Sequence, residues 1–122
     1  ELVAEKLEHV IFDRVSSNPR NSEIMDGAQV YLDHGCDVIL AIGGGSPMDC
    51  AKGIGIVVTN NCHVDLFEGI DQVTIPGPPL ICIPTTSGTG ADVSQFSIIT
   101  NRNEFRKYAI IRITRYNLFT RN

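Results

Sequence analysis

The chain has 122 residues, of which 43% are hydrophobic and 20% are charged, and its formal net charge is −4. This length allows one domain with a core sufficient for independent folding. No stretch approaches the roughly 18 consecutive apolar residues of a membrane-spanning helix, and the charged beginning is unlike a secretory signal. We therefore expect a cytoplasmic protein that has no membrane partner.

The first third of the chain predicts a helix, a strand and a second helix. Residues 3–7 are typical of the last turns of a helix, and residues 9–13 are typical of a strand. A loop follows, and residues 22–34 have the pattern of a helix that Gly35 ends. One side of this helix is apolar and is formed by Ile24, Ala28, Tyr31 and Leu32. This alternation of strands and helices favours an α/β fold.

A strand, three glycines and a long helix come next. Residues 37–42 form the apolar segment expected of a strand that is buried on both faces of a parallel sheet. Ser46 is suited to the N-cap of the helix, Pro47 to its first position, and Asp49 completes a Ser-x-x-Asp capping pattern. The helix body has a buried stripe formed by Met48, Ala51, Ile54 and Val58.

The start of this helix predicts an anion-binding site. The glycines at 43–45 let the backbone approach a ligand closely, and a helix N-terminus offers free N–H groups and partial positive charge. A phosphate or pyrophosphate fits both features. The alternative is a turn without a ligand, in which Asp49 only caps and Lys52 is solvated. The standard dinucleotide fingerprint is not matched, because Met48 stands where its third glycine would be, and no Walker loop occurs.

A second polar loop follows the apolar run at residues 79–83. It reads Pro-Thr-Thr-Ser-Gly-Thr-Gly, and the hydroxyls of Thr85, Thr86 and Thr89 can bind a ribose, a phosphate or a carboxamide. The alternative is a capped turn whose hydroxyls satisfy local backbone groups. Ligands bind at the carboxyl ends of strands in open α/β sheets, so the two loops form one site if their strands are neighbours.

The cysteines and histidines do not have the spacing of metal ligands. The four cysteines are 14, 12 and 20 residues apart, and Cys50 and Cys82 fall in apolar segments, which favours reduced core thiols. The three histidines form no His-x-x-x-His pair, so we expect no metal site built from this chain alone.

The remaining segments predict a loop, a hairpin and a basic end. Residues 71–79 contain three prolines and are interpreted as a loop and not as a domain linker. Residues 95–100 and 105–111 predict a β-hairpin. From residue 101 onward there are six basic side chains and one acidic side chain, without the signature of a nucleic-acid-binding module. We therefore expect no nucleic-acid partner.

Residues 43–52 and 84–94 together resemble the two signature stretches of the iron-containing alcohol dehydrogenases. Asn18-Pro19 and the segments 26–32 and 66–69 are also similar to that family, so the resemblance runs from about residue 10 to residue 111. It implies an α/β fold with a Rossmann-like open, mostly parallel sheet, flanking helices and a β-hairpin, incomplete relative to the family.

The same resemblance implies a division of the chain into two parts. Residues 1–111 would be a partial dinucleotide-binding domain, and residues 112–122 a divergent basic tail. The family's carboxy-terminal helical domain, which holds a catalytic Fe²⁺ or Zn²⁺, would be absent together with its metal ligands. We therefore expect little or no turnover from the chain alone.

The resemblance also implies a function. Members of the family transfer hydride between NAD or NADP and a small alcohol or aldehyde, and we expect a homo-oligomer. Carried over by position, the residues that would hold the pyrophosphate are Gly44, Gly45 and Ser46, with Asp49 beside it. Thr85, Thr86 and Thr89 would line the cofactor, and Lys107 would reach it from a hairpin strand.

Two other interpretations stay open at this stage. Dehydroquinate synthase, an NAD-dependent lyase, has a similar fold and a Gly-Gly-Gly loop, although residues 84–93 favour the alcohol dehydrogenases. The chain could instead be a truncated, non-catalytic product that binds nucleotide weakly or associates with other chains, because missing sheet neighbours leave strand edges and apolar faces exposed. One departure from the family is conservative: the second signature usually has glutamate where Asp92 stands.

Overall fold

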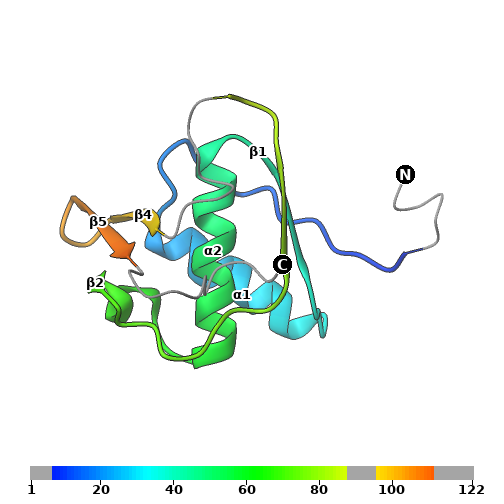
Figure 1. The fold of residues 1–122 in the computed structure, drawn as a ribbon, viewed down its shortest axis with the longest axis horizontal. Helices are drawn as coiled ribbons and strands as arrows, with labels where there is room; N and C mark the ends of the chain where they lie inside the picture. The colour runs from blue at the N-terminus through cyan, green and yellow to red at the C-terminus, as the bar shows by residue number, and fades with distance from the viewer. Residues whose placement is uncertain (1–6, 88–95, 112–122) are drawn as a thin grey trace.

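A computed structural model of the chain describes residues 7–87 and 96–111, and it alternates helices with strands (Figure 1). In chain order the elements are α1 (Asn21–Asp33), β1 (Ile39–Gly43), α2 (Gly45–Asn60), the short 3-10 helix η1 (Val64–Phe67), β2 (Gly69–Ile70), β3 (Leu80–Pro84), β4 (Phe96–Asn101) and β5 (Arg106–Ile111). The expected β-hairpin and the loop at residues 71–79 are both confirmed.

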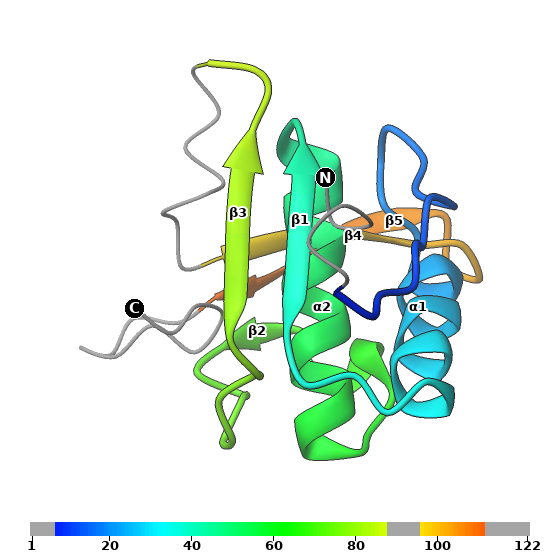
Figure 2. The ribbon, with the colours of Figure 1, turned by 90° about the vertical axis from the view of Figure 1, so that its right-hand side faces the viewer.

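The strands form two sheets, and α2 lies between them (Figures 1 and 2). β1 and β3 pair in parallel, from Ile39 opposite Leu80 to Gly43 opposite Pro84. β5 is the middle strand of the second sheet and pairs in parallel with β2 and antiparallel with β4. The unit β1–α2–β3, with parallel strands joined through a helix, confirms the predicted α/β class.

α2 is buried on most of its circumference, because it contacts a sheet on one side and α1 and β4 on the other. The predicted stripe is confirmed at Met48, Ala51 and Ile54, but Cys50, Ile56 and Val57 are buried as well. A helix packed on opposite sides cannot keep one polar face, so the amphipathic pattern understates its burial. The alternative interpretation of the glycine loop as a turn without a ligand took Lys52 to be solvated, and on this point it is wrong, since only 1% of Lys52 is exposed.

α1 matches its predicted span within one residue, and Gly35 follows it with a φ of +61°, in the region that favours glycine. Ile24 and Ala28 are buried against α2, and Tyr31 continues their stripe. Leu32 was expected on that stripe but is 54% exposed. Its side chain points about 100° around the helix from Tyr31, beyond the contact with α2.

The predicted strand at residues 9–13 is wrong: the structure has no regular secondary structure from residue 7 to residue 16. A strand needs a neighbour to pair its backbone N–H and C=O groups, and among the described residues β1 pairs only with β3. The predicted helix at residues 3–7 lies almost entirely outside the described residues. No helix in the described ranges is both long and apolar enough to cross a membrane.

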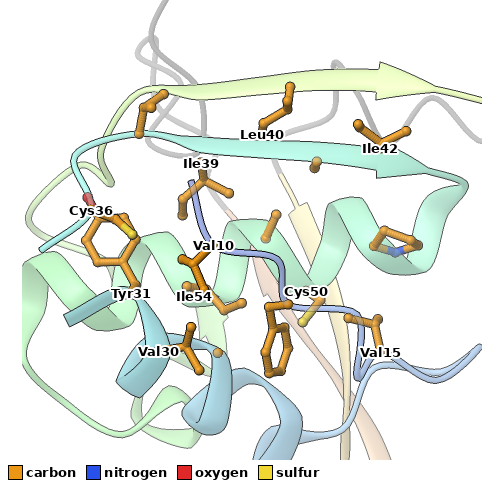
Figure 3. A pocket seen from close by; sticks show the side chains of 16 residues that line it. Val10, Val15, Val30, Tyr31, Cys36, Ile39, Leu40, Ile42, Cys50 and Ile54 are labelled. Atoms are coloured by element: carbon orange, nitrogen blue, oxygen red, sulfur yellow. The ribbon is translucent and has the colours of Figure 1, made fainter. Parts of the chain in front are cut away.

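The β1–β3 sheet is covered on one face only. Ala41 and Leu80 pack against Met48 and Ala51 of α2, whereas four large apolar side chains on the other face are between 38% and 57% exposed: Leu40, Ile42, Ile81 and Ile83. Figure 3 shows Leu40 and Ile42 pointing away from α2 and Ile39 pointing toward it. We call these four residues the outer face. The expectation of burial on both faces is therefore wrong for β1 as described.

Candidate functional site

The two polar loops lie side by side at the carboxyl ends of β1 and β3, which Figure 2 shows at the same end of the sheet. The Thr85 backbone N–H donates to the Gly43 carbonyl at 2.8 Å, one step beyond the last paired residues of the two strands. A Cβ on Gly44 would lie 3.4 Å from Thr86 Oγ1, so the first loop faces the second. The predicted convergence of the two loops is confirmed.

The first loop enters α2 through glycine and not through Ser46. Gly44 is the N-cap, with φ −88° and ψ −153°, and the helix begins at Gly45. Gly43 has a φ of +143°, and a Cβ there would lie 2.8 Å from the Pro47 ring, so only glycine fits. The prediction that Ser46 caps the helix and that Pro47 is its first residue is wrong, because the turn closes earlier than the Ser-Pro pair.

Ser46 instead ties the loop to another part of the chain. Its hydroxyl donates a hydrogen bond to the backbone carbonyl of Ser17. The hydroxyl hydrogen is thereby used, so Ser46 can offer an anion its backbone N–H. Gly44 has no side chain that could cap the helix, and the first turn of α2 contains no acidic residue. The N–H groups of this turn are therefore not taken by a side chain that would compete with the anion.

Asp49 lies one turn into α2 and contacts β4. Ser97 Oγ donates to its backbone carbonyl at 2.8 Å, and the Ile98 backbone N–H bonds to its carboxylate. Burial raises the pKa of this carboxyl above its usual value, while the charge of Lys52 and the Ile98 bond act in the opposite direction. The structure therefore gives Asp49 a role in joining α2 to the hairpin, in place of the predicted capping.

Lys107 lies on β5 opposite Thr100, on the hairpin strand that was expected for it. Its Nζ donates to Asn18 Oδ1 at 2.9 Å, and both side chains are exposed. Residues 16–19, which we call the 16–19 loop, thus contact both Ser46 and Lys107. In the sequence, Asn18 and Pro19 were identified only as part of a resemblance, and they were not predicted to lie near the glycine loop. A local sequence pattern cannot predict a contact between residues that are 89 positions apart.

The second loop is described only as far as Ser87, so the predicted site residue Thr89 lies outside the described residues. Thr85 and Thr86 are both exposed, and their hydroxyls are accessible to a ligand at the loop. The structure therefore brings together Gly44, Gly45, Ser46, Thr85 and Thr86, with Lys107 connected to them through the 16–19 loop.

A separate cavity of about 170 Å³ lies between β1, α2, the end of α1 and residues 10–15 (Figure 3). Apolar side chains dominate its lining, and none of the described residues that line it is charged. Such a lining does not suit a pyrophosphate, which needs donors or positive charge. The cavity exists where residues 10–15 pass β1 without pairing to it, so it is a packing space and not the predicted nucleotide site.

The described residues contain no group of three His, Cys, Asp or Glu side chains placed to hold a metal ion. Cys50 is a buried free thiol, and burial together with the carboxylates of Glu23 and Asp49 raises its pKa to about 12. A thiol with that pKa is protonated near neutral pH, which makes it a poor nucleophile and a poor metal ligand.

The sequence profile of the iron-containing alcohol dehydrogenases matches residues 1–117. The chain belongs to the iron-containing alcohol dehydrogenase family. This membership favours the first interpretation of the sequence over the dehydroquinate synthase alternative. Among its relatives in the family is a 1,3-propanediol dehydrogenase from Citrobacter freundii, 39% identical over 102 residues, which are 84% of this chain and 26% of that protein.

Solved structures agree with the fold. A crystal structure of 1,3-propanediol oxidoreductase matches with a TM-score of 0.87 and 38% identity, covering 91% of this chain and 29% of that one. A sulfoacetaldehyde reductase from Bifidobacterium kashiwanohense, solved in complex with NAD⁺, matches with a TM-score of 0.80 and 28% identity, covering 92% and 29%. The chain therefore spans about a quarter of the length of the curated relatives it matches.

Proposed function

We propose that this chain forms the dinucleotide-binding part of a cytoplasmic, NAD- or NADP-dependent alcohol dehydrogenase that converts an alcohol to an aldehyde or ketone. The observation that carries the proposal is the placement of the two loops at one end of the β1–β3 sheet, with Thr86 facing Gly44. Family membership supports the same proposal, and so does the NAD⁺ complex of the sulfoacetaldehyde reductase.

The pyrophosphate would bind at the start of α2. The N–H groups of the first turn have no partner within the helix, and a helix of 16 residues places its partial positive charge there. Gly44 and Gly45 bring no side chain into the approach, and Ser46 contributes its N–H. In this proposal Asp49 holds α2 against β4 just behind the bound phosphates.

The second loop would bind the uncharged parts of the dinucleotide. Thr85 and Thr86 can donate to and accept from ribose hydroxyls, and Thr89 is assigned the same role. Lys107 would add one positive charge from β5. When bound, the dinucleotide supplies the hydride acceptor or donor; the residues of this chain bind and orient it.

The metal belongs elsewhere in this proposal. The described residues of this chain do not fit Fe²⁺ or Zn²⁺, since no cluster of suitable ligands occurs among them. We assign the metal, and most contacts to the alcohol, to parts of the protein that the relatives have and this chain does not cover. We propose that this chain has little or no turnover by itself, and that identical chains associate, for which the exposed outer face gives support.

Calorimetric titration of the folded 122-residue chain with NAD⁺, NADH, NADP⁺ and NADPH tests the proposal. We expect binding of at least one of the four. Gly44→Ala places a methyl group between the two loops and should weaken that binding by about tenfold, or roughly 1.4 kcal/mol. Gly55→Ala is the matched control, because it adds the same group on α2 beside Pro78, far along the helix from the loops.

Absence of binding by folded wild-type chain contradicts the proposal. Equal weakening by Gly44→Ala and Gly55→Ala contradicts the assignment of the site to the two loops, because the effect would then come from a general change in α2.

A further inference from the structure

The 16–19 loop is held in place by neighbouring elements. The Ser16 backbone N–H donates to the Glu23 carboxylate of α1 at 2.7 Å, and the Thr100 backbone N–H of β4 donates to the Pro19 carbonyl at 2.8 Å. Pro19 is buried, and Ser16 Oγ donates to the same Glu23 carboxylate. The backbone around Asn18 is therefore fixed independently of the Asn18 side chain.

From this fixed position the loop contacts two different walls of the proposed site. Ser17 accepts a hydrogen bond from Ser46 at the start of α2, and Asn18 accepts one from Lys107 on β5. These contacts join segments that are 29 and 89 residues apart in sequence. The 16–19 loop thus sets where Lys107 lies relative to the glycine loop.

We propose that Asn18 is a positioning residue that holds the Lys107 ammonium group ready for an anionic part of the dinucleotide, a role that rests on the proposed function. A free lysine on a strand samples many rotamers, and fixing it during binding costs conformational entropy. Asn18 fixes the lysine before the ligand arrives. Because its side chain is a neutral amide, it leaves the positive charge of Lys107 uncompensated, and Lys107 Nζ keeps two further hydrogens to donate.

The contact contributes little to the stability of the fold. Both side chains are exposed, and β5 is held by its backbone pairing with β4, which includes Lys107 opposite Thr100. A hydrogen bond between exposed groups is largely replaced by bonds to water when it is lost. Variants at Asn18 are therefore expected to fold normally and to report on binding.

The test measures affinity by calorimetry for the wild-type chain, Asn18→Leu, Lys107→Met and the double variant, with NADH or, where the wild-type chain binds it more tightly, NADPH. Asn18→Leu keeps a similar size but removes the acceptor, and we expect about fivefold weaker binding, from the lost charge-assisted bond and the freed lysine. In the Lys107→Met background the Asn18→Leu change should have no further effect. Asn103→Leu, an exposed asparagine in the hairpin turn, is the matched control and should bind as wild type does.

A spectroscopic measurement separates positioning from a general structural role. The ¹⁵N signal of the Lys107 ammonium group should show protection from exchange in the unliganded wild-type chain, and Asn18→Leu should remove it. The backbone amide spectrum outside residues 16–19 and β5 should stay unchanged.

Three results would overturn the inference. Unchanged affinity in Asn18→Leu means that Asn18 does not position the lysine, and tighter binding means that it competes with the ligand for it. A further loss in the Lys107→Met background means that Asn18 acts independently of Lys107. Failure of the wild-type chain to bind any dinucleotide is a different result: it removes the proposed function, and the inference with it.

Discussion

The core around α2 and the outer face of the β1–β3 sheet contain the same kinds of side chain in opposite surroundings. Ile24, Ile56 and Ile99 are fully buried where α1, α2 and β4 meet, whereas Ile42 and Ile81 on the outer face are 57% and 56% exposed. The core is shielded from water because α2 is covered on one side by the β1–β3 sheet and on the other by α1 and β4. Among the described residues the sheet has a layer on one side only, so no layer packs over its outer isoleucines.

The largest expected difference between these regions is in the cost of removing an isoleucine side chain. We predict that Ile56→Ala lowers the free energy of unfolding by about 3–4 kcal/mol, since it leaves a cavity in a closed core. At a protein concentration low enough to keep the chain unassociated, Ile81→Ala should lower it by less than about 0.5 kcal/mol, because its side chain is then half in water. Urea unfolding of both variants gives the two values.

Similar losses for the two isoleucines would contradict this comparison. They would show that something covers the outer face in solution, such as a second copy of the chain. Sedimentation of the Ile81→Ala variant at several concentrations then shows whether the chain self-associates. Self-association would also make stability depend on concentration.

A smaller contrast is expected between two glycines on different sides of α2. A Cβ on Gly53 would lie 2.8 Å from Ile24 Cδ1 and within 3.3 Å of two more Ile24 atoms, in the closed core. Gly53→Ala should therefore destabilise by about 1–2 kcal/mol, the overpacking outweighing the better helix propensity of alanine.

Gly55 has more room on the sheet side of α2. The nearest atom to a Cβ there is Pro78 Cδ at 3.4 Å, so Gly55→Ala should be neutral or stabilise by up to about 1 kcal/mol. Thermal unfolding of both variants checks the pair. A stabilising Gly53→Ala would mean that α1 and α2 pack less closely than the structure shows.

The third expected effect is the pH dependence that the buried Cys50 thiol adds to stability. Burial raises its pKa to about 12 from the ordinary thiol value of 9.0, so folded and unfolded chains both hold the proton below about pH 9. Above that pH the unfolded chain loses the proton first, and stability falls by about 1.4 kcal/mol per pH unit up to the folded pKa.

Comparison with Cys50→Ala isolates this effect. Unfolding of the two proteins at pH 8, 9 and 10 should show a steeper decline for wild type above pH 9. Parallel declines would mean that Cys50 is accessible to water, and the core around it looser than the structure indicates. The exposed Cys62 serves as a reference, since it should react quickly with a thiol reagent in folded protein while Cys50 does not.

The sequence predicted what depends on local pattern. The span of α1, the body of α2, the hairpin and the stop at Gly35 all follow from periodicity and from residues with a fixed backbone preference, whereas the start of α2 does not. The neighbouring placement of β1 and β3 could also be inferred, because a strand–helix–strand unit pairs its strands in parallel.

The features that the sequence could not predict depend on which other segments of the fold lie beside a residue. Residues 9–13 have the composition of a strand but pair with no strand in the described part of the chain. Leu40 has the composition of a buried residue, yet it is 38% exposed. Ser46 has the chemistry of an N-cap, yet the Ser17 carbonyl, 29 residues away in sequence, takes its hydrogen bond. Lys52 is charged and still buried, since α2 is enclosed on two sides.

The central claim, that the dinucleotide binds between the two loops and not in the apolar cavity behind β1, is tested most directly by a backbone ¹⁵N NMR titration with NADH. The account predicts that the amide signals of Gly44, Gly45, Thr85 and Thr86 shift with increasing ligand, while those of Val30 and Cys36 at the cavity stay in place. Shifts confined to the cavity, or none at saturating NADH and none at saturating NADPH in a folded chain, would contradict it.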